Sequence, residues 1–372
     1  TTDRTRSLLY PMNNLAAENH SAGDKSVALL VQQLAFIQGT CLIVADENWS
    51  QANWASLASN KQCSISLVSN RFDIARSANQ AGLNCLFNDF DFSELTANSF
   101  DTVLYRLSKE RASSHHIINQ AGQLLKPGGK LWLSGEKNEG IKTSVKQACA
   151  LFGDRTNAEK HGVCYRASIQ LINLQPKPLD DKQYQAIRLI EPGQGRSFFS
   201  KPGIFGWGKI DRGSAFLVEY LPQFVARFAK QPQSLLDLGC GYGYLACEGY
   251  RQGITQLTAT DNNAAALDAV EKNLSQIENI QYEVVAGDAG DQVNGRFDVL
   301  LCNPPFHQGF SVDGTLGNKF LSSAKRLLAS GGQALFVVNT FIPLEHRAKQ
   351  YFHRVEVLAN NGSFKLVAMG NN

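Results

Sequence analysis

The fold of this chain is decided by the stretch SLLDLGCGYGYLA, residues 234–246. An apolar run that carries one carboxylate, Asp237, leads directly into Gly239, Gly241 and Gly243. A buried strand followed by such a turn is typical of α/β folds, because glycine lets the backbone turn tightly and lets a ligand approach the main chain. The stretch therefore predicts a ligand site at the carboxyl end of a strand.

The spacing of these glycines argues against a dinucleotide-binding oxidoreductase. Such folds carry G-x-G-x-x-G, whereas this turn reads D-x-G-x-G-x-G. Asp237 precedes the turn, where a carboxylate can hold an amino-acid ammonium through a charge-assisted hydrogen bond. Asp261 ends the next apolar segment, LTATD at 257–261, where it can bind the two hydroxyls of a ribose. Binding of NAD would revive the oxidoreductase hypothesis.

A second unusual stretch, RFDVLLCNPPF at 296–306, ends another apolar run. Asn303 closes the run, and Pro304, Pro305 and Phe306 follow it. Because proline fixes the backbone, hydrogen-bond acceptors placed here are preorganised. The carboxyl ends of parallel strands meet at one edge of the sheet, where ligands bind. We therefore expect Asn303 beside the glycine turn.

The chain carries the same plan twice. The segment SFDTVLYRLSKE (99–110) matches RFDVLLCNPPF, and INQAGQLLKPGGKLWLSG (118–135) matches LSSAKRLLASGGQALFVV (321–338). The segment TCLIVADENWS (40–50) matches the glycine stretch but lacks its glycines. Alternating strands and helices of this length predict mostly parallel sheets. The N-terminal copy has thus kept the scaffold and lost both loops that carry chemistry.

We expect two domains, residues 1–178 and 179–372, because the stretch NLQPKPLDDKQ (173–183) is charged, contains prolines and has no apolar period. A length of 372 residues, 43% of them hydrophobic, is ample for two cores. The net charge is +3, and it lies in the first half: residues 1–190 carry 20 Lys and Arg against 17 Asp and Glu, and the remainder 16 against 16. This small excess permits a nucleic-acid partner without requiring one.

The eight cysteines indicate a reducing compartment. They are scattered, form no C-x-x-C pair and do not lie at zinc-ligand spacing with histidines, so we expect reduced thiols, no metal and a cytoplasmic protein. No apolar run approaches the roughly 20 residues of a membrane span. We expect no membrane partner, and a monomer.

Residues 234–340 resemble class I S-adenosylmethionine-dependent methyltransferases. The glycine turn matches the first motif of that superfamily, Asp261 its second-strand acid, and VVAGDAGD (284–291) its third motif, where Asp288 lies by the adenine amino group. The resemblance implies two tandem Rossmann-like methyltransferase domains with mostly parallel seven-stranded sheets. It also implies S-adenosylmethionine as methyl donor and S-adenosylhomocysteine as product. The cofactor-binding residues that it implies are Asp237, Gly239, Cys240, Gly241, Gly243, Asp261, Asn262, Asp288, Ala289 and Asn303.

In such methyltransferases N-P-P-[FY] marks methylation of a planar amino nitrogen, as in a nucleobase or a glutamine amide. The lone pair of this nitrogen is delocalised, which makes it a poor nucleophile. The Asn303 side-chain oxygen and the Pro304 carbonyl can accept from the amine and present it to the methyl group. Phe306 offers a ring on which a base can stack. The implied catalytic residues are Asn303, Pro304 and Phe306, and the implied substrate-binding residues are Pro305, Phe306 and His307.

Two other side chains of this stretch are weaker catalytic candidates. Cys302 precedes Asn303, whereas the nucleophilic cysteine of cytosine-C5 methyltransferases follows a proline in a motif without N-P-P. His307 is better placed to orient the substrate than to accept a proton, because the ammonium product is acidic and needs no strong base.

NPPFHQG (303–309), PGIFGWGKIDRGSAFLVEYL (202–221) and the duplicated layout resemble the bacterial ribosomal RNA guanine-N2 methyltransferases. In that family a catalytic domain follows a degenerate methyltransferase-like domain. The P-G-I-F and K-x-D elements favour the 16S small-subunit branch over the 23S branch. The first part of 202–221 lines the cofactor site of the family, and a helix is expected from about Arg212. Trp207 departs from the smaller residues of the family and either stacks on substrate or packs. The residues implied here at the cofactor site are Phe205, Lys209, Asp211 and Gly213.

The resemblance implies ribosomal RNA or a ribosomal subunit as partner and N2-methylguanosine as product. The target guanosine has to be unpaired or flipped out of its helix to reach the methyl group. Three alternatives stay open: a 23S rRNA guanine-N2 methyltransferase, a protein glutamine-N5 methyltransferase, and a non-catalytic RNA-binding assembly factor.

Overall fold

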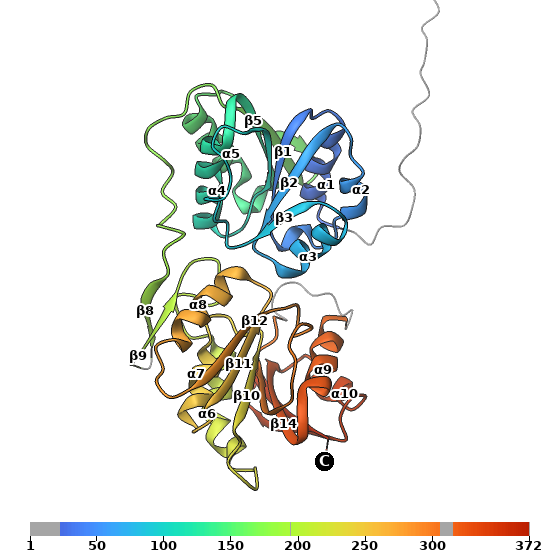
Figure 1. The fold of residues 1–372 in the computed structure, drawn as a ribbon, viewed down its shortest axis with the longest axis vertical. Coiled ribbons are helices and arrows are strands. Elements are labelled where there is room, and N and C mark those ends of the chain that lie inside the picture. Colours follow the sequence, from blue (N-terminus) through green and yellow to red (C-terminus); the bar gives the residue numbers. More distant parts are fainter. Residues whose placement is uncertain (1–22, 194, 306–314, 372) are drawn as a thin grey trace, which may run out of the picture.

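The computed structural model describes residues 23–193, 195–305 and 315–371, which form two α/β domains in tandem (Figure 1). The first domain holds a seven-stranded sheet of order β3-β2-β1-β4-β5-β7-β6, in which β7 alone runs antiparallel to its two neighbours and the other pairs are parallel. Its elements are α1 (Lys25–Val31), η1 (Gln32–Ala35), β1 (Gly39–Ala45), η2 (Glu47–Trp49), α2 (Trp54–Ala58), β2 (Cys63–Ser69), α3 (Phe72–Gln80), β3 (Asn84–Phe87), β4 (Phe100–Arg106), α4 (Arg111–Leu124), β5 (Leu125–Glu136), η3 (Lys137–Glu139), α5 (Ile141–Phe152), β6 (Glu159–His161) and β7 (Cys164–Gln170).

The second domain repeats this topology with the order β12-β11-β10-β13-β14-β16-β15. A hairpin, β8 (Arg188–Gly193) and β9 (Arg196–Ser200), precedes it. The two sheets confirm the predicted fold of tandem, mostly parallel seven-stranded domains. The remaining elements are α6 (Arg212–Val225), β10 (Ser234–Leu238), α7 (Tyr244–Arg251), β11 (Gln256–Asp261), α8 (Ala264–Leu274), β12 (Gln281–Ala286), β13 (Phe297–Cys302), α9 (Thr315–Leu327), β14 (Leu328–Asn339), α10 (Leu344–Ala348), β15 (Arg354–Asn360) and β16 (Phe364–Gly370).

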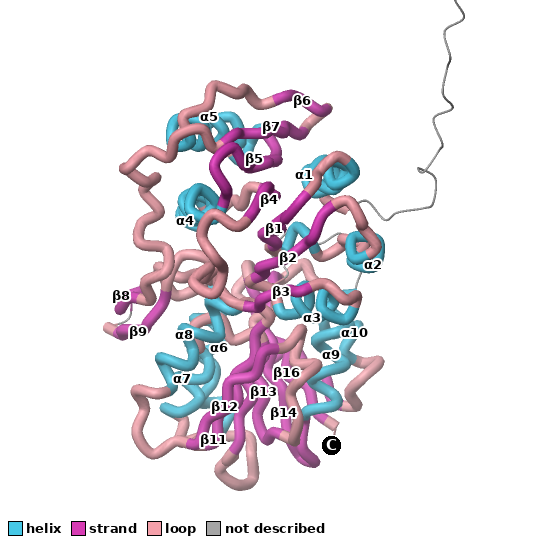
Figure 2. Tube along the Cα trace, turned by 45° about the horizontal axis from the view of Figure 1, so that its top comes forward, coloured by secondary structure: helices cyan, strands magenta, loops and turns pink. Residues whose placement is uncertain are grey.

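Each sheet is covered by helices on both faces, as Figure 2 shows, which explains the continuous apolar runs of the central strands. Successive residues of β10 point to opposite faces: Leu235 packs with α6, α7 and α8, whereas Leu236 packs with α9. Both side chains are fully buried. No helix among the described residues is long and apolar enough to cross a membrane.

The repeated Phe-Asp pair has the same structural task in both copies. The Asp101 carboxylate accepts hydrogen bonds from the backbone N–H and the hydroxyl of Thr40 at the start of β1. The Asp298 carboxylate accepts from the backbone N–H of Ser234 at the start of β10. Each aspartate thus sets the register of the two central strands of its sheet, and Thr40 and Ser234 are equivalent positions.

A buried ion pair ties the N-terminal domain to the segment 201–211, which we call the strap and which joins β9 to α6. The Lys201 ammonium binds the Asp89 carboxylate, and the two side chains are only 2% and 4% exposed. Tyr184 donates to the same carboxylate (2.7 Å), and its ring lies 3.8 Å from the Lys201 ammonium. Asp89 follows β3, so the strap is anchored to the first domain at its first residue.

We expect Lys201→Met to lower the free energy of unfolding by about 3–5 kcal/mol, because it leaves Asp89 buried without its cation. The double variant Lys201→Met with Asp89→Asn should lose less, since a neutral amide can still accept from Tyr184. Urea unfolding of both variants measures this. A single variant as stable as the wild type would contradict the assigned pair.

Candidate active site at the carboxyl edge of the second sheet

The glycine turn follows β10 as predicted, and its backbone requires glycine. Gly239, Gly241 and Gly243 all have positive φ angles, of 79°, 54° and 88°. At Gly243, the residue before α7, a Cβ atom would also lie 2.5 Å from the Val270 side chain of α8. A side chain at this position would push the start of α7 away from α8. Glycine therefore allows the turn and α7 to pack closely against α8.

Asp237 is fully buried at the end of β10, and only one of its oxygens is satisfied. Oδ2 accepts from the backbone N–H of Ala246 (2.9 Å), whereas Oδ1 is enclosed and has no hydrogen-bond partner among the described residues. Burial raises the pKa of this carboxyl to about 7, and the negative charge of Asp261 adds to the rise. A buried carboxylate oxygen without a hydrogen-bond partner raises the free energy of the folded state. An ammonium ligand that binds this oxygen would lower it again.

Asp261 is held by the two loops that flank it. Its Oδ2 accepts from the backbone N–H of Gly241 and its Oδ1 from that of Asn263, both at 2.9 Å. The carboxylate therefore lies against the glycine turn, at the position where the sequence predicts the ribose hydroxyls. Cys240, inside the turn, is buried, and burial raises the pKa of its thiol well above the ordinary value.

Asn262, a predicted cofactor-binding residue, is directed toward the N-terminal domain. Its carbonyl oxygen accepts from Phe72 N–H (2.9 Å), and its Oδ1 accepts from Asp73 N–H (3.0 Å) at the start of α3. In return Ala264 N–H donates to the Asn70 carbonyl (2.9 Å). In Figure 1 α3 faces the second domain at this junction. The first domain thus supports the loop that carries Asp261.

The third predicted cofactor segment is also joined to α3. Asp288 accepts a hydrogen bond from the Lys319 ammonium, and its backbone N–H donates to Asp291 (2.9 Å). Arg76 on α3 forms an ion pair with the same Asp291 (2.5 Å). Ala289, which has a positive φ of 49°, is buried in the hydrophobic core beside β13 and α9.

The Asn303 amide is fixed by two acceptors at the start of α6, one on its capping residue and one in its first turn. Its Nδ2 donates to Asp211 Oδ2 (2.8 Å) and to Ser214 Oγ (2.9 Å). Asp211 in turn caps α6 by accepting from Ser214 N–H (2.9 Å). With both N–H groups engaged, Oδ1 is the end of the amide that remains for a ligand. This orientation suits an acceptor for an amino group.

The other predicted cofactor-site residues of the segment 202–221 lie in three different environments. Gly213 is buried in α6, where a Cβ atom would lie 3.2 Å from the Phe364 ring, so close packing explains the glycine. Phe205 is 56% exposed, and Lys209 is exposed. Asp211 lies beside Asn303 and positions it.

The start of the NPPF motif is described and its end is not. Pro304 is buried and Pro305 is exposed, whereas Phe306 and His307 lie outside the described residues. Cys302 is fully buried, and burial raises the pKa of its thiol well above the ordinary value, with Asp237 contributing. A protonated, enclosed thiol is a poor nucleophile, which agrees with the small role expected for Cys302.

Three contributors to the candidate site were not predicted from the sequence: Ser214, Lys319 and the ion pair between Arg76 and Asp291. Ser214 carried a signal, because D-x-x-S at 211–214 is a helix-capping pattern that follows the glycine-rich strap. Lys319 and Arg76 carried none, since their partners are remote in sequence. No group of three metal-ligating side chains lies together in the described part of the chain.

The N-terminal copy lacks this chemistry at the equivalent positions. From the matched strand registers, Ile43 stands in the place of Asp237 and Ser69 in the place of Asp261. Arg106 stands in the place of Asn303, where it is buried between Asp24 (2.9 Å) and Glu139 (2.7 Å). The first copy thus has an apolar residue, a serine and internal ion pairs where the second has the carboxylates of Asp237 and Asp261 and the amide of Asn303.

Two family models match this chain, one for each domain. Residues 26–177 match the family model "Methyltransferase small domain N-terminal", and residues 195–368 match "Methyltransferase small domain". The ribosomal RNA small subunit methyltransferase C of Shewanella halifaxensis is 30% identical over 270 residues, which cover 72% of this chain and 76% of that protein. The chain belongs to the ribosomal RNA small subunit methyltransferase C family. The predicted family, its small-subunit branch and the class of enzyme, a methyltransferase, are confirmed.

Other relatives cover more of the chain. The methyltransferase C of Haemophilus influenzae strain PittGG is 28% identical over 345 residues, or 92% of this chain and 98% of that protein. A T. thermophilus 16S rRNA N2 G1207 methyltransferase (RsmC), solved with AdoMet and guanosine, superposes with a TM-score of 0.80 at 23% identity. It covers 94% of this chain and 92% of that one, so both domains share the fold of this methyltransferase C.

We expect S-adenosylmethionine to bind more weakly as the pH falls below about 7, because a protonated Asp237 must lose its proton before it can hold an ammonium. The dissociation constant should rise toward tenfold per pH unit. Asp237→Asn should lack this pH dependence and bind about 10- to 150-fold more weakly, as expected for a lost charge-assisted hydrogen bond of about 1.5–3 kcal/mol.

Calorimetry in buffers of different ionisation enthalpy measures both the affinity and the proton released on binding. Asp298→Asn, at the opposite edge of the same sheet, is the control. Equal pH dependence in Asp237→Asn and wild type would show that another group titrates.

Proposed function

We propose that this protein transfers a methyl group from S-adenosylmethionine to the exocyclic N2 amine of a guanosine in 16S ribosomal RNA. The observation that carries the proposal is the Asn303 amide, whose N–H groups are held by Asp211 and Ser214 so that Oδ1 is left as an acceptor. It follows β13, next to the strand that ends in the half-satisfied Asp237. The names of the relatives support the substrate, and that of the T. thermophilus protein supports the guanosine equivalent to its G1207.

The residues present fit the proposed cofactor. The unpaired Asp237 Oδ1 suits the ammonium of its methionine part, and Asp261, oriented by Gly241 and Asn263, suits the ribose hydroxyls. Asp288 and the buried Ala289 border the adenine subsite, with Lys319 beside them. When bound, S-adenosylmethionine supplies a methyl group on a positively charged sulfur.

The role of the chain is to orient the guanine amine. Asn303 Oδ1 and the Pro304 carbonyl accept from the N–H groups of the amine, which turns its lone pair toward the methyl group. Asp211 and Ser214 prevent the amide from rotating and offering its NH₂ end instead. Phe306 and His307 are proposed to contact the base, on the strength of the motif alone.

The two parts of the chain take different tasks in this proposal. Residues 179–372 bind the cofactor and perform the transfer, whereas residues 1–178 position the RNA and support the cofactor loops through α3. All eight cysteines are unpaired and buried, which supports the proposed cytoplasmic location. We propose a monomer, because the tandem copies already occupy each other's contact loops.

We expect Asn303→Ala to lower kcat by about 100- to 1000-fold, as for the loss of a preorganised group at the reacting centre. The measurement is tritium transfer from labelled S-adenosylmethionine to naked 16S RNA, small subunits and large subunits, followed by digestion to nucleosides. Asn294→Ala, an exposed loop residue at the other end of β13, is the matched control.

Label in N2-methylguanosine of the small subunit, lost in Asn303→Ala alone, supports the proposal. Label in the large subunit would favour the 23S alternative, and label in protein would favour a glutamine methyltransferase. A cofactor that binds without transfer to any of these would favour the assembly factor.

Ser214→Ala should lower kcat about 3- to 10-fold, because the Asn303 amide loses one of two acceptors, worth about 0.5–1.5 kcal/mol. The KM for RNA should stay unchanged, since Ser214 is buried behind Asn303. Steady-state kinetics with small subunits separates the two constants. A rise in KM at constant kcat would instead place Ser214 in substrate binding.

A further inference from the structure

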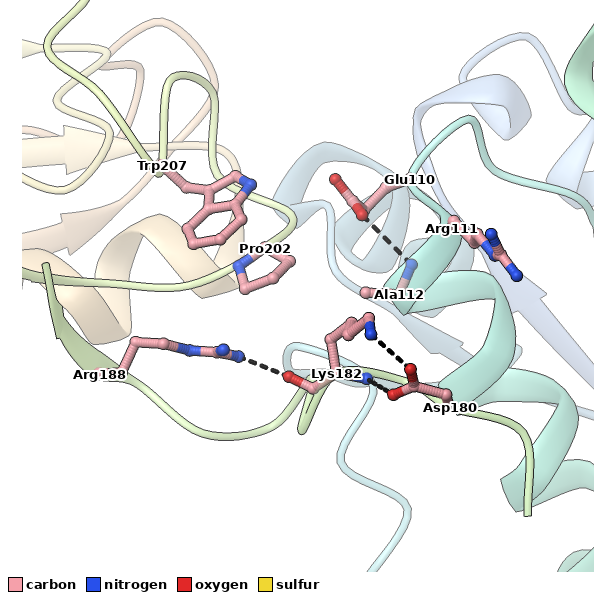
Figure 3. A pocket seen from close by; sticks show the side chains of 8 residues that line it. All are labelled: Glu110, Arg111, Ala112, Asp180, Lys182, Arg188, Pro202 and Trp207. Atoms are coloured by element: carbon pink, nitrogen blue, oxygen red, sulfur yellow. Dashed lines mark hydrogen bonds and ion pairs between the residues drawn. The ribbon is translucent and has the colours of Figure 1, made fainter. Parts of the chain in front are cut away.

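A cavity lies between the two domains on the outer side of the strap. Its volume is about 340 Å³, within the range of small-ligand sites. Figure 3 shows Pro202 and Trp207 of the strap on one side and the start of α4 on the other. The residues that line it are Glu110, Arg111, Ala112, Asp180, Lys182, Arg188, Pro202 and Trp207.

The strap connects this cavity to the proposed catalytic site. Its Gly203 carbonyl accepts from the Asn263 amide (2.9 Å), beside Asp261, and Ile204 lies 3.9 Å from the position of a Cβ at Gly241. The backbone N–H of Trp207 donates to the Ile204 carbonyl (3.1 Å). Four residues later Asp211 holds Asn303. One short segment thus contacts the reaction site on one side and lines the cavity on the other.

The side chains of the cavity match a nucleotide. The Arg188 guanidinium lies 5.8 Å from the centre of the Trp207 ring, an arrangement of planar groups on which a base can stack. Arg188 Nε is enclosed without a hydrogen-bond partner in the described residues. Across the cavity, Glu110 Oε1 accepts from Ala112 N–H (3.2 Å), which orients the carboxylate and leaves Oε2 as an acceptor for a base N–H.

The charge of the cavity also suits RNA. Arg111, Lys182 and Arg188 outnumber Glu110 and Asp180, so the net charge of the lining is +1. Asp180 is paired with Lys182 (2.5 Å) and Glu110 is held at the helix start, so each carboxylate already has a partner. Lys182 is engaged by Asp180, and Arg188 Nη2 donates to the carbonyls of Lys182 (2.7 Å) and Gln183 (3.2 Å). The Arg111 guanidinium extends from the start of α4 away from the cavity (Figure 3), where it can contact a phosphate of the RNA chain that leads to it.

We propose that this cavity binds a second nucleotide of the substrate RNA, next to the guanosine that is methylated. Trp207 and Arg188 stack on its base, Glu110 accepts from a base N–H, and Arg111 contacts a phosphate of the RNA chain. This subsite rests on the proposed function. It assigns a substrate role to Trp207, and it makes the N-terminal domain one wall of the RNA path.

The test compares Trp207→Ala with Trp207→Phe, which keeps a ring for stacking. The matched control is Trp132→Ala, because Trp132 is also partly buried and also lies under an arginine, Arg166 at 5.2 Å, but on β5, away from the cavity. Fluorescence anisotropy with a labelled 16S RNA fragment gives the RNA dissociation constant without requiring methyl transfer. Calorimetry gives the affinity for S-adenosylmethionine.

Trp207→Ala should raise the RNA dissociation constant about tenfold, and Trp207→Phe should restore most of the affinity. Arg111→Glu should reduce the slope of the logarithmic salt dependence by about one, whereas Lys61→Glu, at the opposite edge of the first sheet, should not. The affinity of Trp207→Ala for S-adenosylmethionine should change less than about twofold. If the substitution instead disturbed the strap, the affinity for S-adenosylmethionine would fall as well, because the strap contacts the cofactor loops.

An RNA affinity in Trp207→Ala equal to that of Trp132→Ala would overturn the proposal. So would subunit binding that depends on Trp207 but survives digestion of the RNA, since the cavity would then hold a protein. If RNA binding depends on Trp207 but no N2-methylguanosine forms, the subsite stands and the proposed reaction fails. If methylation occurs independently of Trp207, the reaction stands and the subsite fails.

Discussion

One buried carboxylate at the end of β10 constrains the rest of the second domain. Asp237 has one oxygen bound to the start of α7 and one oxygen without a protein partner, and both are shielded from water. In its ionised form such a group destabilises the folded chain unless a cation reaches it. The glycine turn follows this strand end, and its three glycines let a ligand approach the main chain there. Asp237 thus serves ligand binding and does not stabilise the fold. The other site residues lie around it.

Much of this could be predicted from the sequence, because the residues concerned are local to strand ends. The glycine turn, Asp261 and Asn303 each follow an apolar run, and parallel strands bring their carboxyl ends to one edge. Contacts between elements remote in sequence could not be predicted. Nothing in the sequence near Asn303 indicates that its amide is held from α6, 89 and 92 residues away. Asn262 illustrates the same limit, since its neighbour Asp261 suggests a ligand whereas its side chain caps a helix of the other domain.

The first copy shows how a binding site can be filled while its scaffold is kept. Ile43 and Ser69 stand where the second copy has the carboxylates of Asp237 and Asp261, and Arg106, with two acidic partners, stands where the second copy has the Asn303 amide. The strand that leads to Arg106 keeps Asp101, whose counterpart Asp298 fixes the register in the second copy. Residues that hold the sheet together are thus shared, and those that face a ligand have diverged.

The contact between Asn70–Phe72 and Asn262–Ala264 has a further consequence. These segments are equivalent in the two copies, and each donates one backbone N–H to the other, as across the two-fold axis of a homodimer. In a true homodimer every substitution occurs on both sides, so neither half can specialise alone. Joining the halves in one chain removes that restriction. Among the hydrogen bonds of the described residues at this junction, only Asn262 contributes a side chain, which caps α3. One half can thus lose its chemistry while it still supports the other.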